Sequence, residues 1–77
     1  MMMTLKDVLK KYRQDNNISD AVWYGICKHY TRGTNPNYDT IRHYLAPYYL
    51  HFSNELATDK LIKEELLRFI EEYKSKI

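Results

Sequence analysis

The fold is decided by the pattern of residues 4–19, which read TLKDVLKKYRQDNNIS. Apolar side chains recur there at the i, i+3, i+4, i+7 spacing of one helix face. They are Leu5, Val8, Leu9 and Tyr12. Thr4, with Asp7 after it, can cap the start of this helix. The asparagine pair that follows is expected to end it, and Ser19 can cap the next one. The stretch therefore predicts a helix over residues 4–16 and a second helix that begins after Ser19.

The second and third predicted helices continue this periodicity. The stripe of the second helix, which we expect to be buried, comprises Val22, Trp23, Ile26, Cys27 and Tyr30. Gly33 can adopt the left-handed conformation that ends a helix. A third helix can begin with Asn35 as its cap and Pro36 as its first residue. Its apolar positions are Tyr38, Ile41, Leu45, Tyr48, Tyr49 and Phe52. Pro47 lacks a backbone donor, so this helix must kink there or end near Leu45 and restart.

The last predicted helix begins after Ser53 or Thr58, either of which can cap it. Its apolar side chains are Ile62, Leu66, Phe69, Ile70, Tyr73 and Ile77. Spacings of 4, 3 and 4 residues, typical of a short coiled-coil seam, link four of them. The seam residues are Ile62, Leu66, Phe69 and Tyr73. This pattern predicts a homodimer, and the alternative is that the stripe folds back to cover the first two helices. Both can hold together, because Leu61, Leu67 and Ile70 widen the stripe enough to touch the core and a second copy.

Length and composition predict the fold class. The chain has 77 residues, of which 44% are hydrophobic and 29% are charged, so it has material for one modest core. The chain has only two glycines and no strand-turn-strand pattern, which favours helices throughout. We therefore expect residues 1–77 to form a single all-α domain, a small bundle of four or five short helices.

Charge and cysteine content bear on partners and compartment. The net charge of +2 argues against an acidic mimic of DNA but is weak support for a nucleic-acid partner. Cys27, the one cysteine, cannot form an internal disulfide, and no leader segment precedes the domain. These features predict a reducing, cytoplasmic compartment. No apolar stretch approaches the ~20 residues of a membrane span, so no membrane association is expected.

Aromatic residues are concentrated in the middle of the chain. Six of the eight tyrosines, the one tryptophan and one of the two phenylalanines fall between Trp23 and Phe52. Lys28, Arg32, Arg42 and three histidines are interleaved with them. Rings with polar tips set among cations suit a surface that grips a phosphate backbone or a protein. The same rings are equally suited to filling a core.

Residues 5–19 read Leu5-Lys-Asp-Val-Leu-Lys-Lys-Tyr-Arg-Gln-Asp-Asn-Asn-Ile18-Ser19. This segment resembles the first helix and the start of the second helix of phage-repressor helix-turn-helix regulators. The pattern-level resemblance covers residues 4–45. It departs from the family at Thr31 to Asn37, where the family usually has a turn of about three or four residues. The resemblance implies a helix-turn-helix-like core and a small DNA-binding regulator of transcription, of the phage or mobile-element kind.

The same resemblance implies that the third helix enters the major groove of DNA. The side chains presented there would be Asn37, Asp39, Thr40, Arg42 and His43, with Arg42 able to pair bidentately with guanine. The side chains placed to hold phosphates would be Lys28, Arg32 and Thr34. A homodimer would suit a two-fold operator. The alternative is that these residues form solvated polar faces and a glycine-capped loop.

A second functional interpretation rests on the tyrosines. Tyr44, Tyr48 and Tyr49 can stand partly exposed as anchors for a larger host or phage protein, because tyrosine is enriched at interface hot spots. The protein would then be a small non-enzymatic inhibitor or adaptor with an aromatic and basic docking surface. Binding through such anchors is less sensitive to salt than binding to phosphates.

The soft-ligand side chains do not indicate a metal site or a catalytic centre. They are Cys27, His29, His43 and His51. Cys27 and His29 would lie on opposing sides of a helix rather than at i, i+4, which is the wrong spacing for zinc. A Cys/His nucleophile pair would also need a substrate pocket that a chain of this size can hardly enclose. We expect no metal, no cofactor and no enzyme activity.

Overall fold

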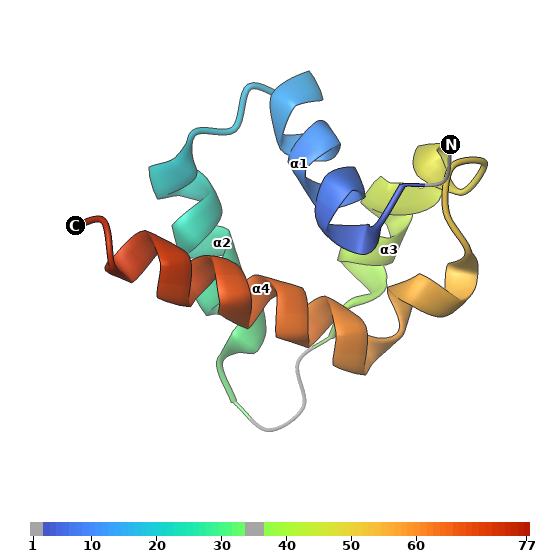
Figure 1. Cartoon of the computed structure of the whole chain (residues 1–77). Coiled ribbons are helices and arrows are strands. Elements are labelled where there is room, and N and C mark those ends of the chain that lie inside the picture. Colours follow the sequence, from blue (N-terminus) through green and yellow to red (C-terminus); the bar gives the residue numbers. More distant parts are fainter. Residues whose placement is uncertain (1–2, 34–36) are drawn as a thin grey trace.

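The computed structural model describes residues 3–33 and 37–77, and across these ranges it contains helices and turns but no strand (Figure 1). The α-helices are α1 (Leu5–Asp15), α2 (Asp20–Thr31), α3 (Asp39–Leu45) and α4 (Asp59–Lys74). Two short 3₁₀ helices, η1 (Ala46–Tyr48) and η2 (Asn54–Ala57), lie between α3 and α4 in the chain. The prediction of a small all-α bundle is confirmed.

The boundaries of α1 and α2 follow from their capping residues. Thr4 Oγ1 accepts a hydrogen bond from the Asp7 backbone N–H at 3.1 Å, and Asp7 Oδ2 accepts one from the Thr4 N–H at 3.3 Å. These two bonds form the predicted capping box. After α1, Asn17 has a positive φ of 55°, a conformation that asparagine tolerates better than most residues. Ser19 caps α2 through its hydroxyl, and Gly33 beyond α2 has the predicted left-handed φ, 86°.

α3 is shorter than the apolar pattern suggested. It begins at Asp39, whose backbone N–H donates to Asn37 Oδ1 at 2.9 Å, and the predicted start at residues 35–36 lies outside the described residues. It ends at Leu45, and the 3₁₀ turn that contains Pro47 follows at once. Of the two predicted outcomes at Pro47, the chain adopts the break rather than the kink, because proline cannot donate the next helical hydrogen bond.

Both candidate caps of the last helix are used, each for a different element. Ser53 Oγ accepts from the Glu55 N–H at 3.2 Å and opens η2. Thr58 Oγ1 accepts from the Leu61 N–H at 3.3 Å and opens α4. The segment between α3 and α4 is therefore a series of short turns rather than a continuation of either helix.

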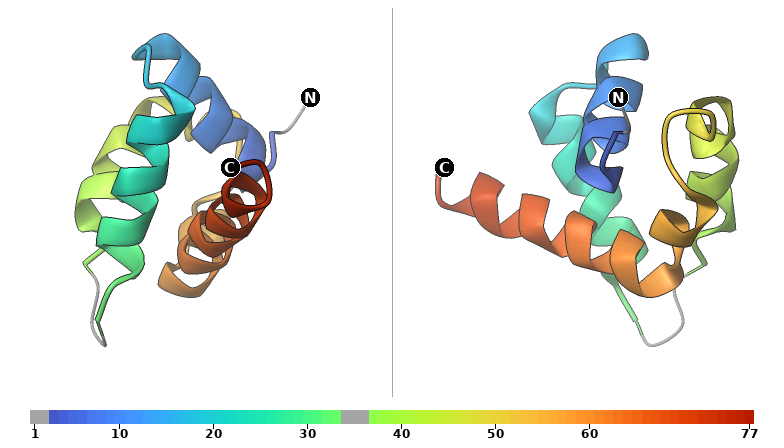
Figure 2. Two further views of the ribbon diagram at one scale, coloured as in Figure 1. Left: turned by 90° about the vertical axis from the view of Figure 1, so that its left-hand side faces the viewer. Right: turned by 45° about the vertical axis from the view of Figure 1, so that its right-hand side comes forward.

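α4 closes the core of the domain. It runs across α2 and also contacts α1, which in turn contacts α3 (Figures 1 and 2). The backbone N–H of Met3 donates to the carbonyl of His51 at 2.7 Å, so the chain before α1 is held to the turn after η1. The buried side chains are Leu5, Val8, Leu9, Trp23, Cys27, Tyr38, Ile41, Leu45, Phe52, Ala57, Ile62, Leu66 and Ile70.

The predicted dimer seam on α4 belongs to this core. Ile62 and Leu66 are 0% exposed. Phe69 and Tyr73 pack against rings of α2, at centroid distances of 6.5 Å and 4.7 Å. The stripe folds back over α1 and α2, as the alternative predicted, and Ile62 and Leu66 are not exposed to a second copy. The homodimer through this helix stays a prediction.

Candidate functional site

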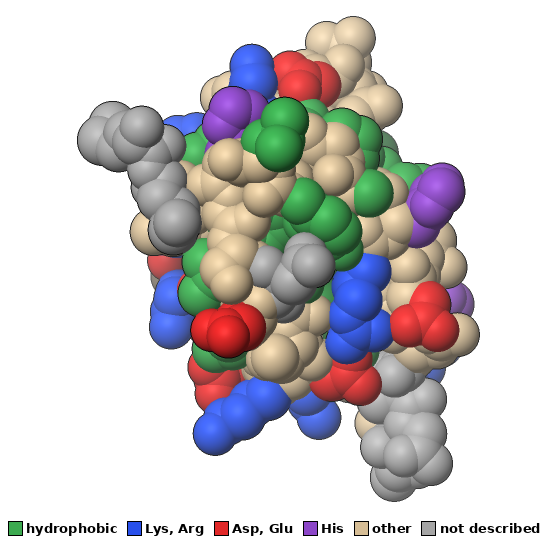
Figure 3. Space-filling model, turned by 90° about the vertical axis from the view of Figure 1, so that its right-hand side faces the viewer, with side chains coloured by type: hydrophobic (Ala, Val, Ile, Leu, Met, Phe, Trp, Pro, Cys, Tyr) green, Lys and Arg blue, Asp and Glu red, His purple; other side chains and the backbone are tan. Residues whose placement is uncertain are grey.

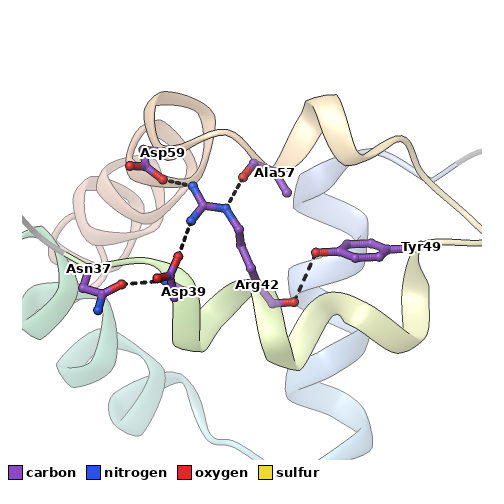
Figure 4. Close-up of polar contacts among 6 residues, drawn as sticks. All are labelled: Asn37, Asp39, Arg42, Tyr49, Ala57 and Asp59. Atoms are coloured by element: carbon purple, nitrogen blue, oxygen red, sulfur yellow. Dashed lines mark hydrogen bonds and ion pairs between the residues drawn. The ribbon is translucent and has the colours of Figure 1, made fainter.

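Arg42, the predicted reader of guanine, is held inside the fold (Figure 4). Its Nε donates to the carbonyl of Ala57 at 2.9 Å, and its Nη1 donates to Asp39 Oδ1 at 2.9 Å. Nη2 forms an ion pair with Asp59, the first residue of α4. The Tyr49 hydroxyl donates to the Arg42 carbonyl at 3.3 Å. The guanidinium thus ties α3 to the start of α4, and a bidentate contact with guanine would require breaking these bonds.

The other predicted DNA contacts come from two helices: Asp39, which is bonded to Arg42, is on α3, and Lys28 is on α2. The side chains of Lys28, Arg32, Asn37, Asp39, Thr40 and His43 are exposed, and Thr34 lies outside the described residues. Lys28 Nζ lies 5.3 Å from the ring centroid of Tyr24, which packs on Tyr73 near the end of α4. Arg42 instead contacts the first residue of α4. The Lys28 ammonium is thus directed toward the end of α4, whereas the Arg42 guanidinium lies at its start.

The face that carries α3 is mixed in charge. Figure 3, which shows the molecule from the right-hand side of Figure 1, has hydrophobic side chains over its middle and upper part. Acidic side chains lie beside the basic ones on the same face. Asp39 at the start of α3 is exposed and would repel a phosphate. This face therefore lacks the basic stripe typical of a protein that reads duplex DNA.

The three predicted anchor tyrosines have different environments. Tyr44 is 44% exposed, and its ring stacks on Tyr12 of α1 with centroids 5.3 Å apart. Tyr48 and Tyr49 are half-buried, and their hydroxyls are bonded to the Asp15 carboxylate and to the α3 backbone. Of the three, Tyr44 is the one whose ring is free enough to meet a partner.

Tyr44 borders a small apolar crevice between α1, α2 and α3. Its volume is about 30 Å³. The lining residues are Leu9, Tyr12, Trp23, Ile26, Tyr30, Ile41, Tyr44 and Leu45.

Val22, which the sequence predicted to be buried, is 56% exposed on α2. Trp23 and Cys27 occupy the buried side of that helix, and Val22 therefore lies on its outer side.

The hydrogen bond between Tyr48 and Asp15 couples the end of α1 to η1. The pKa of Tyr48 is raised to about 12, mainly because its hydroxyl donates to the Asp15 carboxylate. The pKa of Asp15 is lowered, first by this bond and further by Lys11, whose Nζ lies 3.3 Å from the carboxylate. Since the folded pKa of Asp15 is depressed, its contribution to stability is present above the ordinary aspartate pKa and is lost as pH falls through the folded value.

Tyr48→Phe is expected to raise the pKa of Asp15 toward its ordinary value, because the first cause of the depression is removed while Lys11 remains. Carboxyl-carbon NMR titration of the wild type and the variant measures this directly. Tyr49→Phe is the matched control, since its hydroxyl bonds to a backbone carbonyl instead. An unchanged Asp15 titration in Tyr48→Phe would show that the bond does not persist in solution.

A groove of about 680 Å³ lies between α1, the start of α2 and the second half of α4. Trp23 and Phe69 are among its lining residues, and the Arg13 guanidinium lies over both rings, 5.7 Å and 4.8 Å from their centroids. Arg13 also forms an ion pair with Asp20 at the start of α2. A planar cation is therefore fixed on an aromatic base by contacts from three helices.

The groove carries a net positive charge. Its five cationic side chains are Lys6, Lys10, Arg13, Arg68 and Lys76, and its three acidic side chains are Asp20, Glu65 and Glu72, a difference of +2. Each acidic side chain is paired with a cation that also lines the groove, in the pairs Arg13–Asp20, Arg68–Glu65 and Lys6–Glu72. Lys10 and Lys76 have no ion pair among the described residues. Lys10 and Lys76 can therefore attract an anion without giving up an ion pair of their own.

The Cys27 thiol lies in the core of the domain. Its burial raises the pKa of the thiol to about 12, so the nucleophilic thiolate is scarce at neutral pH. Within the part of the chain that the structure describes, no three histidine, cysteine or acidic side chains gather as a metal site. None of the helices described is long and apolar enough to cross a membrane.

The sequence-based reasoning missed the groove. Lys6, Lys10 and Arg13 were not among the predicted binding residues, although their i, i+4, i+7 spacing places them along one side of α1. That spacing was the available signal for a continuous basic wall. The opposite wall, α4, comes from the other end of the chain, and no local pattern indicates that the two walls face each other.

Comparisons of this chain with protein-family models, with curated proteins and with solved structures found no match. The functional argument therefore rests on the groove, the crevice and the placement of the charged side chains.

Proposed function

We propose that this protein is a non-enzymatic DNA-binding protein that holds the phosphate backbone in the groove between α1 and α4. The observation that carries the proposal is the charge balance of the groove: all three acidic lining residues are paired, while Lys10 and Lys76 are not among the ion pairs of the described residues. Neutralising phosphates with such lysines releases counterions, which is the main source of affinity in sequence-independent binding.

The groove also offers neutral donors and acceptors beside the cations. Gln14 and Asn17 line it with exposed amide side chains, which can bond to phosphate and sugar oxygens. This version of DNA binding differs from the helix-turn-helix mode that the sequence suggested. It does not use Arg42, which is bonded to Asp59 at the start of α4, or Lys28, which lies over the ring of Tyr24, and neither residue lines the groove.

Lys10→Ala and Lys76→Ala are each expected to weaken DNA binding and to reduce the slope of log affinity against log salt by ~0.7–0.9 for each phosphate that the protein no longer neutralises. Fluorescence anisotropy titrations with labelled oligonucleotides, both single-stranded and duplex, at several salt concentrations measure both effects. The matched control is Lys60→Ala, which removes the same charge from the exposed first turn of α4, outside the groove.

Equal losses in all three variants would mean that only net charge matters, and the groove would not be the site. Absence of binding to both kinds of oligonucleotide by the wild type would reject the proposal altogether.

A second function, docking on a larger protein as an inhibitor or adaptor, is favoured by a different observation. The ring of Tyr44 is 44% exposed and lines the apolar crevice, and Tyr44 is not among the residues of the groove. Partly exposed aromatic side chains at an apolar depression are typical of interface anchors. Binding of this kind would survive salt concentrations that abolish binding to phosphates.

A further inference from the structure

We propose that the DNA strand held by the groove is single-stranded, an inference that rests on the proposed function. The walls of the groove are close together. Lys6 on α1 and Glu72 on α4 meet across it, with Nζ and Oε1 3.9 Å apart, so the walls are there separated by no more than two extended side chains. A DNA duplex accommodates a whole α-helix of about 10–12 Å diameter within one of its grooves. The duplex itself is therefore too wide to lie between α1 and α4.

The Arg13 guanidinium offers a planar surface to exposed bases. It lies over the rings of Phe69 and Trp23, its side chain is 16% exposed, and Arg13 is one of the groove-lining residues. Unstacked bases pack on aromatic rings and on guanidinium planes, and a base is free to do so in a single strand but not inside a duplex. Lys10 and Lys76 would then follow the phosphates while the bases turn inward.

The rest of the molecule lacks a duplex-reading element among its described residues. α3, the helix expected to enter the major groove, has seven residues. Its one arginine is bonded to Ala57 and to two aspartates. The concave, ring-based and cationic groove is instead the arrangement that single-strand binding proteins use.

The test uses the wild-type protein and three labelled probes: an oligothymidine of about 16 nucleotides, its duplex with oligoadenosine, and an abasic strand of the same length. Anisotropy titrations at matched ionic strength should show the oligothymidine binding about tenfold or more tightly than either other probe, since two stacked bases together contribute more than that factor. The abasic strand keeps the phosphates and removes the stacking, so no protein variant that could misfold is required.

Duplex binding as tight as that of the oligothymidine would overturn the single-strand inference and leave DNA binding itself standing. Equal binding of the abasic strand would overturn the role of Arg13 and the rings, and with it the inference. Failure of all three probes to bind would remove the proposed function and the inference together.

Discussion

Leu66→Ala is expected to lower the free energy of unfolding by about 3 kcal/mol, the typical cost of truncating a fully buried leucine and leaving a cavity. Leu66 is 0% exposed at the centre of α4, where that helix covers α1 and α2. A domain of this size has a total stability of roughly 5 kcal/mol, so the variant should keep only about 2 kcal/mol and unfold at a much lower urea concentration than the wild type. Urea titration followed by circular dichroism measures the loss.

The adjacent residue provides the matched control. Leu67 is 41% exposed on the outer side of the same helix, and Leu67→Ala should change stability by less than about 1 kcal/mol. Sedimentation of the wild type and both variants measures their oligomeric state, which shows whether Leu66 packs in the core of one chain or in a dimer seam. If Leu66→Ala kept full stability and only dissociated a dimer, α4 would be a coiled-coil element after all, and the internal packing of its stripe would be incorrect.

Arg42→Ala is expected to lower the free energy of unfolding by about 2 kcal/mol. Most of this loss comes from the charge-assisted bond to the Ala57 carbonyl, because that residue is buried and its acceptor would lose its partner. The pairs with Asp39 and Asp59 add less, since both carboxylates are exposed to solvent. Arg42→Lys should not restore the loss, because an ammonium cannot reach three acceptors with the geometry of a planar guanidinium.

His43→Ala, at the exposed neighbouring position on α3, is the control for this substitution, and thermal unfolding of the three variants compares them. The same variants test the recognition-helix prediction, since folded Arg42→Ala at low temperature should bind DNA as the wild type does. Unchanged stability together with a loss of DNA binding would instead make Arg42 a reader of bases.

Features set by a few neighbouring residues could be predicted from the sequence. The capping box of Thr4 and Asp7, the cap at Ser19, the positive φ of Gly33 and the break before Pro47 all depend on local backbone chemistry, and all are present. Helical periodicity in α1 and α4 also identified most of the core, because an apolar stripe must be covered.

Features that depend on contacts distant in the sequence could not be predicted. Arg42 has the spacing of an exposed helix residue, and nothing near it reveals that a carbonyl and a carboxylate at positions 57 and 59 will meet its guanidinium. The groove likewise depends on α1 and α4, from opposite ends of the chain, facing each other. The prediction that Val22 is buried was wrong for a different reason. The five apolar residues of α2 form a stripe wider than the surface that this helix buries, and Val22, at the edge of that stripe, is 56% exposed to water.

Trp23 separates the two concavities of the molecule, since its ring lines both the groove and the crevice. It is also the chain's single tryptophan, so the indole emission of the protein comes from one position that touches both faces. A strand that disturbs Arg13 and an apolar group that enters beside Tyr44 would each alter the surroundings of the same fluorophore. The unlabelled protein therefore carries its own optical reporter for either kind of ligand.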